Sequence, residues 1–352
     1  MARAKPTVAV TGAAGYFARA VIETLVDDDR IGRVLGFDVR PATFSHPKFV
    51  FDHLDVRNAA FESRLRGVDT LVHLAFIMDP IHDEALMRDV NVAGSQNIFR
   101  CAGRAGVKKI IYASSATVYG AHPDNDFPLT EDSPLRANLD FSYPAHKLEV
   151  EYIIKECREE FPKLKFVTFR PAIAFGPNVD NAWSHFLELP VFLSVKGHSP
   201  VWQFVHEDDV GRALAFAVFE DIDGPYNLAP SDWVSTEDSL AIVGRRRVEL
   251  SEPRAFAMLE RLWRLGLSEA PAGMLHYVMH PWVVSPNKLE QAGFVCRHTS
   301  AESFALVAEQ ARAFVRLGKT RVRRSDVARG AAAGVGILGA AAALRRARHR
   351  SA

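Results

Sequence analysis

The sequence has few cysteines, little net charge and no long apolar run near its start. Its 352 residues include three cysteines, Cys101, Cys157 and Cys296, which are far apart and form no C-x-x-C pair. That spacing argues against a zinc knuckle and a disulfide framework, and it favours a reducing compartment. Because 43 Lys and Arg stand against 42 Asp and Glu, no basic field covers the chain, and nucleic acid is a poor partner.

The first residues show no readable targeting segment. The chain passes through Lys5 and Pro6 into its first apolar run without the apolar stretch of a secretory signal. We therefore expect a cytoplasmic protein.

Short apolar runs alternate with helical patterns. Runs at residues 8–11, 34–37, 49–51, 71–74, 110–113, 166–169 and 226–228 are typical of buried strands. Segments 16–26, 92–105, 144–161 and 208–219 carry apolar residues at three- and four-residue spacing, which predicts helices. The alternation predicts the fold class: α/β, with a doubly wound parallel sheet.

A glycine-rich turn follows the first run. Gly12-Ala13-Ala14-Gly15 leads into the predicted helix that starts at Tyr16, and Ala18 takes the third small position. Such a turn offers backbone N–H groups and the positive end of a helix to a pyrophosphate. The pattern therefore predicts a dinucleotide site.

A carboxylate ends the second predicted strand. Asp38 follows Gly36-Phe37, where it is placed to accept hydrogen bonds from both ribose hydroxyls of NAD and to repel the 2′-phosphate of NADP. Arg40 partly offsets that repulsion. The alternative is that Asp38 only forms a turn before Pro41.

Tyr143 and Lys147 are four residues apart on a predicted helix. They share one face, so the ammonium can lower the pKa of the phenol from about 10 and make it a general base. We expect Ser142 to cap this helix, because Pro144 suits a first turn. His146, between the pair, is expected on the surface.

Hydroxyl side chains gather at the end of the fifth apolar run. Ser114, Ser115 and Thr117 lie where ligands of open α/β sheets bind. Ser and Thr at strand ends are also ordinary turn formers, and this alternative stays open.

Taken in order, these motifs resemble a known family. The set comprises Thr11-Gly12-x-x-Gly15, Asp38, Asp55-Val56-Arg57, His73-Leu74-Ala75, Asn91-Val92-x-Gly94, Ser115 to Gly120, Tyr143-x-x-x-Lys147, Arg170-Pro171-Ala172, Gly176-Pro177 and Phe204-Val205-His206 with Asp208-Asp209-Val210. From about residue 7 to about residue 305 the chain is similar to the extended short-chain dehydrogenases/reductases of the NAD-dependent epimerase/dehydratase type.

The resemblance implies roles for the matching residues. It implies that Tyr143, Lys147, Ser115 and Thr117 are catalytic. It implies that NAD is the cofactor and that the cofactor-binding residues are Gly12, Ala14, Gly15, Tyr16, Phe17, Asp38, Asp55, Val56, Leu74, Ala75, Phe76, Asn91, Ser114, Tyr143, Lys147 and Pro171.

The chain departs from the family where a sugar nucleotide is usually held. Trp202-Gln203 stand where many epimerases have an Arg that binds the diphosphate, and Ile173-Ala174-Phe175 replace a usual Asn-Val-Tyr. Arg212 or the run Arg245-Arg246-Arg247 is an alternative source of charge. The segment His206-Glu207-Asp208-Asp209 looks like a metal cluster, but adjacent side chains diverge, so we predict no metal.

These inferences give a domain plan. We expect a NAD-binding Rossmann domain at residues 5–178 with 204–228, a small C-terminal substrate-binding cap at 179–203 with 229–320, and a basic Ala/Gly-rich tail at 321–352. The apolar part of the tail is shorter than the roughly 20 residues of a membrane-spanning helix. Weak contact of the tail with an anionic membrane surface, and a homodimer, stay open.

The predicted function is NAD-dependent oxidoreduction at a secondary alcohol, of the epimerase/dehydratase type, with Tyr143 as general base. The substrate is a small hydroxyl compound, a sugar nucleotide or a relative. One alternative is a dehydrogenase of a steroid-like or lipid-derived alcohol, which the Trp-, Phe-, Leu- and Met-rich cap suits. The other is a non-catalytic NAD-binding regulatory protein.

Overall fold

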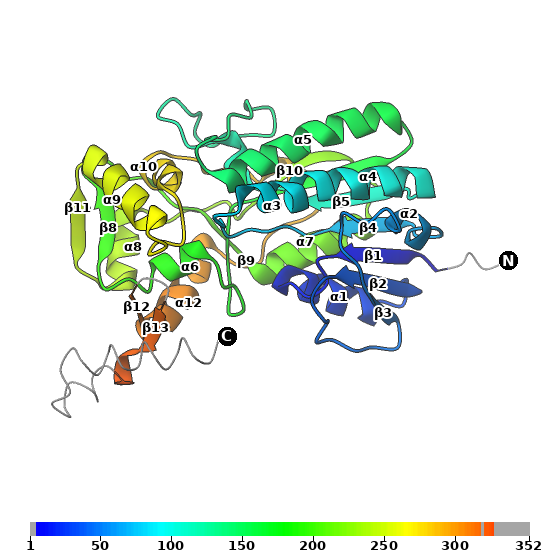
Figure 1. Ribbon diagram of the computed structural model, residues 1–352, viewed down its shortest axis with the longest axis horizontal. Coiled ribbons are helices and arrows are strands. Elements are labelled where there is room, and N and C mark those ends of the chain that lie inside the picture. Colours follow the sequence, from blue (N-terminus) through cyan, green and yellow to red (C-terminus); the bar gives the residue numbers. More distant parts are fainter. Residues whose placement is uncertain (1–4, 318–319, 327–352) are drawn as a thin grey trace.

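A computed structural model describes residues 5–317 and 320–326. Its centre is a seven-stranded parallel sheet in the order β10-β6-β5-β4-β1-β2-β3 (Figure 1). The strands are β1 (Thr7–Thr11), β2 (Arg33–Asp38), β3 (Phe49–His53), β4 (Thr70–His73), β5 (Lys109–Ala113), β6 (Lys165–Pro171) and β10 (Gly224–Leu228). The strand order reverses between β1 and β4, and such a switch point is where α/β sheets bind ligands.

Helices cover both faces of the sheet. On one face α1 (Tyr16–Asp27) packs against α7 (Glu207–Phe219), and on the other α4 (Gly94–Ala105) lies beside α5 (Ser142–Glu160) and α2 (Phe61–Arg64) (Figure 1). The strands contribute side chains to an apolar core on each face of the sheet. Val8 and Val10 belong to one core, and Ala9 between them belongs to the other. This alternation is the two-residue period of a strand buried on both sides.

The predicted fold class is confirmed, and most of its elements lie within a few residues of their predicted bounds. The helix predicted at 92–105 starts earlier, as a π-helical turn η1 (Asp89–Ala93) after α3 (Glu84–Arg88). The predicted cap at Ser142 is wrong. Ser142 is the first residue of α5, the residue before it makes no side-chain cap, and the Ser142 hydroxyl donates to Glu84 Oε1 at 2.8 Å.

The remaining elements lie mostly beyond one end of the sheet. Figure 1 shows α9, α10, β8 and β11 gathered on the side of the molecule away from β3. The elements are η2 (Ala116–Tyr119), β7 (Ile173–Phe175), α6 (Ala182–Phe186), β8 (Phe192–Val195), β9 (Phe204–His206), α8 (Thr236–Val243), β11 (Arg247–Leu250), α9 (Glu252–Arg264), η3 (Ala272–Leu275), α10 (His276–Met279), α11 (Asn287–Gln291) and α12 (Ser300–Arg312).

A short antiparallel hairpin follows α12. It joins β12 (Phe314–Leu317) to β13 (Thr320–Arg323), so the boundary predicted at residue 321 falls inside a strand. Arg316 and Arg321 both pair with buried Glu188. The tail from residue 327 onward lies outside the described residues. Within the described ranges, no helix combines the length and apolarity needed to cross a membrane.

Candidate active site

The glycine turn is shaped by a close approach of two strand ends. Gly12 has a φ of 71°, and a Cβ placed there would lie 2.7 Å from the backbone nitrogen of Ala75, just past the end of β4. Only glycine fits such a position without displacing the backbone. Gly15 then caps α1, and its N–H donates to Gly12 O at 2.9 Å. The turn therefore opens a helix N-terminus at the switch point, as a pyrophosphate site requires.

Asp38 is held against this turn. Its side chain is buried, Oδ2 accepts from Ala14 N at 3.0 Å, and Oδ1 accepts from Arg40 N at 2.8 Å. The carboxylate thus lies at the end of β2 beside the glycine turn, the position from which it is predicted to bind the ribose of NAD. Arg40 Nε lies 3.7 Å from Asp38 Oδ1, so its charge already has a carboxylate partner.

A buried chain of polar groups braces β1 against β4. Thr11 Oγ1 lies 2.7 Å from His73 Nδ1, and His73 Nε2 lies 3.0 Å from Ser95 Oγ. Burial lowers the pKa of His73 to about 3, and the nearby Lys147 charge adds to this. His73 is therefore neutral at ordinary pH. It fixes the strand ends that form the turn through the hydrogen bonds of its neutral ring.

Asn91 holds the loop after β4. Its side chain accepts from Ile77 N at 2.7 Å and donates to Ile77 O at 2.9 Å. Asn91 Nδ2 also lies 3.5 Å from His146 Nδ1. The expectation that His146 lies on the surface is wrong: it is buried, because α5 packs on η1. Asn91 therefore fixes the backbone of the loop after β4 at Ile77, and its contact with the cofactor stays a prediction.

Asp55 and Val56 lie in the segment that follows β3. The Asp55 carboxylate pairs with Arg57, with Oδ2 at 2.6 Å from its guanidinium. Val56 is buried, and its Cγ2 would lie 2.7 Å from a Cβ on Gly94. The segment therefore lies beside the start of α4, next to β2 and Asp38 in the sheet.

A cavity of about 100 Å³ opens at the C-terminal ends of the strands; we call it the catalytic pocket. It brings together nine of the predicted site residues: Phe17, Leu74, Phe76, Ser114, Ser115, Thr117, Tyr143, Lys147 and Pro171. The others, Gly12, Ala14, Gly15, Tyr16, Asp38, Asp55, Val56, Ala75 and Asn91, are not in its lining. The lining thus holds the hydroxyl and amine groups expected to carry out chemistry.

Lys147 lies beneath Tyr143. Its Nζ donates to Ala113 O at 2.6 Å and lies 3.6 Å from the centroid of the Phe76 ring. Ser115 Oγ lies 2.9 Å from Thr117 Oγ1 and accepts from Thr117 N at 3.2 Å. The pair and the hydroxyls therefore face one space from α5, β5 and η2.

The acidities of the pair differ from expectation. Burial raises the pKa of Tyr143 to about 12. A hydrogen bond with the Ser115 side chain opposes the rise, and the charge of Asp79 adds to it. Burial also lowers the pKa of Lys147 to about 7. The predicted lowering of the phenol pKa is thus wrong for the protein alone, because desolvation, the largest influence on the phenol, disfavours its charged form.

A buried ion pair lies below Lys147. Arg170 binds both oxygens of Glu151, at 3.0 and 2.5 Å, and Ser114 Oγ donates to Glu151 Oε1 at 2.6 Å. Arg170 also donates to Tyr119 Oη at 2.7 Å. Ser114 is therefore committed to this network, which fixes α5 relative to β5 and β6.

Several lining residues were not predicted as site residues from the sequence. They are Met78, Asp79, Pro80, Ala113, Phe141, Ala172, Ile173, Ala174, Asn181, Ala182, Trp183, Met274 and Trp282. Asp79 is the charged one among them; its residue is exposed at the mouth of the pocket, and the desolvation of its carboxyl by neighbouring atoms raises its pKa. The carboxylate directly before Pro80, in the loop after a predicted strand, was the available signal. The aromatic residues come from segments whose packing no periodic pattern showed.

The predicted substitutes for a diphosphate-binding Arg do not reach the catalytic pocket. Gln203 is buried, and its amide bonds the backbone of Pro230 and Val284. Arg212 pairs with Asp209 at 2.6 Å, and Arg245 donates to Ala311 O at 3.2 Å. In the described lining of the pocket, Lys147 is the only Lys or Arg.

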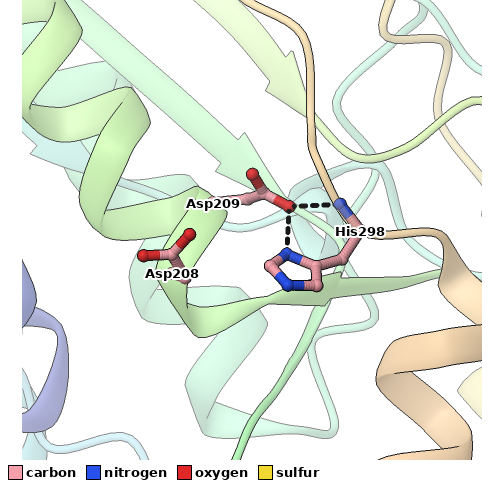
Figure 2. A group of neighbouring side chains, drawn as sticks. All are labelled: Asp208, Asp209 and His298. Atoms are coloured by element: carbon pink, nitrogen blue, oxygen red, sulfur yellow. Dashed lines mark hydrogen bonds and ion pairs between the residues drawn. The ribbon is translucent and has the colours of Figure 1, made fainter.

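Figure 2 shows the one group of described side chains with metal-like spacing: Asp208, Asp209 and His298. Asp209 is fully buried and accepts from His298 N at 3.0 Å and His298 Nδ1 at 3.1 Å. Its other oxygen accepts from Arg297 N at 2.8 Å. No dashed line joins Asp208 to either of the other two residues in Figure 2. The cluster ties α7 to the chain before α12, and the absence of a metal stays a prediction.

The fold and the glycine turn define a Rossmann-type dinucleotide-binding protein. Residues 8–229 match the NAD dependent epimerase/dehydratase family. The chain belongs to this family, so it is an NAD-dependent enzyme, and the residues around Gly12 and Asp38 fit that cofactor.

Relatives and solved structures are consistent with this assignment. An uncharacterized protein of Mycobacterium tuberculosis (strain H37Rv) is 24% identical over 84% of this chain and 82% of its own length. A 4-epimerase of N-acetyl-alpha-D-glucosaminyl-diphospho-ditrans,octacis-undecaprenol from Escherichia coli O157:H7 is 30% identical over 48% of this chain and 49% of its own. The UDP-glucose 4-epimerase of Thermus thermophilus, in complex with NAD, superposes with a TM-score of 0.66 at 22% identity, covering 87% of this chain and 99% of that one.

Proposed function

We propose that this chain transfers hydride between NAD and a secondary alcohol or its ketone, with Tyr143 as the general base. The observation that carries the proposal is the meeting of Tyr143, Lys147 and Ser115 in one pocket at the switch point. In oxidation, the O–H proton of the substrate passes to the Tyr143 phenolate. The hydrogen on the same carbon leaves as hydride with the electron pair of its C–H bond, and a C=O bond forms. NAD, when bound, supplies the hydride acceptor and a positive charge that favours the phenolate.

The pKa values of Tyr143 and Lys147 indicate that bound NAD is needed to form the phenolate. Tyr143 has a pKa of about 12 and Lys147 of about 7 in the protein alone. Bringing the phenol pKa to near 7 needs roughly 7 kcal/mol of differential stabilisation. A phenolate would in turn raise the pKa of Lys147, so the two charges form together. Ser115 orients the reacting oxygen, and Thr117 supports Ser115.

The pocket is poorly suited to a plain sugar nucleotide. A buried diphosphate needs charge-assisted partners, each contributing about 1.5–3 kcal/mol. The described lining offers Lys147, which the chemistry uses, and Asp79, which repels an anion. We expect UDP-glucose and UDP-galactose to bind with dissociation constants of about 1 mM or more.

A lipid-derived alcohol is therefore the second candidate substrate. The E. coli relative is named for a substrate on a polyprenol, which favours a lipid portion, although that substrate also carries the diphosphate for which the described lining of this pocket offers few partners. A homodimer and contact of the tail with an anionic membrane surface stay predictions.

Tyr143→Phe tests the proposal. It should lower kcat by a factor on the order of 10²–10⁴ while NAD affinity changes by a few fold, because only the proton-transfer group is lost. Tyr152→Phe is the matched control, since Tyr152 lies on the same helix and is 46% exposed. Near-normal turnover by the Tyr143→Phe protein would refute the proposed base.

NAD should bind at least about tenfold more tightly than NADP.

A further inference from the structure

A second, larger cavity lies among the elements beyond the sheet; we call it the cap cavity. Its volume is about 480 Å³, and α6, β8, α9, η3 and α10 contribute to its wall. The wall is mainly aliphatic, with Leu189, Leu193 and Leu250 among its members. A space of this size falls in the range of about 300–1,000 Å³ typical of small-molecule sites.

Helix α9 presents its apolar stripe to this cavity. Ala255, Met258, Leu259 and Leu262 all line the cavity and recur at three- and four-residue spacing, the apolar face of a helix. Among the residues of α9, Ala255 alone is buried. The stripe therefore faces a cavity where an ordinary surface helix faces packed core.

The polar side chains in the described wall are already bonded within the protein. Ser194 Oγ accepts from Arg247 Nε at 2.9 Å, and Ser268 Oγ donates to Ala270 O at 2.8 Å. Glu269 bonds both His185 and Arg316, and Arg316 is also bound to Glu188 at 3.0 Å. Using these groups for a phosphate or a sugar would break existing bonds, so the wall favours an apolar ligand.

The cap cavity adjoins the catalytic pocket. Ala182 and Met274 line both spaces, and these are a small side chain and a flexible one. The ring of Trp263 on α9 also lies 4.2 Å, centroid to centroid, from that of His82 in the segment after β4. A molecule whose reacting carbon lies at Tyr143 would have to pass between these two side chains to enter the cap cavity.

We propose that the cap cavity binds the aliphatic chain of the substrate, so that the enzyme acts on secondary alcohols or ketones carrying a long alkyl group. This inference rests on the proposed function, because it needs the hydroxyl at Tyr143. It narrows the substrate class from a hydroxyl compound to a lipid-like one.

The first experiment measures kcat/KM for the whole chain with NAD and a series from 2-butanol to 2-dodecanol, following NADH absorbance. Each added methylene should raise kcat/KM about fourfold until the cavity is filled, which corresponds to about 0.8 kcal/mol per buried methylene. Equal values for 2-butanol and 2-dodecanol would overturn the inference and leave the proposed function standing.

A pair of variants on α9 locates the effect. Leu262 lines the cavity, while Leu265, just beyond the end of the helix, is 62% exposed and is not in the lining. Leu262→Trp should fill the cavity and lower kcat/KM for 2-dodecanol at least about tenfold, with that for 2-butanol within about twofold. Leu265→Trp should match the wild type on both alcohols. Equal behaviour of the two variants would overturn the inference.

Calorimetric titration with 2-dodecanol in the presence of NADH tests the assignment of the cap cavity separately from the proposed function. If no 2-alkanol is oxidised but the Leu265→Trp protein binds 2-dodecanol at least about tenfold more tightly than the Leu262→Trp protein, the cavity assignment holds and the proposed function fails. If neither turnover nor binding differs between the two variants, the assignment of the cavity is wrong.

Discussion

Tyr143 and Lys147 lie one helical turn apart on α5, with the ammonium 5.8 Å from the centroid of the tyrosine ring. Lys147 reaches past the phenol to the carbonyl of Ala113, and desolvation dominates the acidity of both groups. Desolvation thus disfavours the charged form of each group, so the protein alone favours a protonated phenol beside an uncharged amine.

The protonation state of the Tyr143 phenol can be followed by ultraviolet spectroscopy. Because the pKa of Tyr143 is about 12, the spectrum of the wild type minus that of Tyr143→Phe should show no phenolate band at about pH 9. Addition of NAD should produce the band, because the positive ring favours the anion. A phenolate band at this pH without cofactor would contradict the account.

Asp79 should affect the pKa of the general base Tyr143. Burial chiefly raises the pKa of Tyr143, and the charge of Asp79 raises it further. Asp79→Asn removes that charge, so the rise of kcat/KM with pH should shift to lower pH. Asp29→Asn, at an exposed position in the turn after α1, should leave the profile unchanged. A shift to higher pH in Asp79→Asn would sink this assignment.

Gly12→Ala should cost both stability and cofactor affinity. The added Cβ would meet the backbone of Ala75 at 2.7 Å, and the positive φ adds about 1–2 kcal/mol of strain. Gly67→Ala is the control: its φ is 79°, and nothing lies within 4 Å of the added Cβ. It should lower the free energy of unfolding by the strain alone and leave NAD affinity intact. Equal NAD affinities in the two variants would contradict a role for the turn.

His185 should make stability pH-dependent. Burial alone would lower its pKa, but hydrogen bonds to Glu269 and Asp180 outweigh burial, so the pKa is raised. A raised histidine pKa stabilises the folded state fully below the unfolded value of about 6.5, and the gain is lost as pH rises through the folded value. The difference in melting temperature between wild type and His185→Gln should therefore shrink from about pH 6 to about pH 9. A constant difference would show that packing, not charge, is responsible.

The sheet and the glycine turn were predictable because their signals are local. Gly12 must be glycine for its own φ and its contact with Ala75, and an apolar run that ends in Asp38 identifies its strand without help from distant residues. Ser142 and His146 were misplaced because Glu84 and Asn91, distant in sequence, decide their surroundings. The cap cavity depends on packing among α6, α9 and η3, which no periodic pattern encodes.

Hydride transfer at a carbon beside Tyr143 can be followed by deuterium labelling. The wild type is incubated with NAD and 2-dodecanol deuterated at its carbinol carbon, and the cofactor is analysed by mass spectrometry. We expect deuterium in the reduced nicotinamide from the wild type and from Tyr152→Phe, and at least about a hundredfold less per unit time from Tyr143→Phe. Oxidation of the alcohol with its deuterium released to water, or equal labelling by the Tyr143→Phe protein, would contradict this expectation.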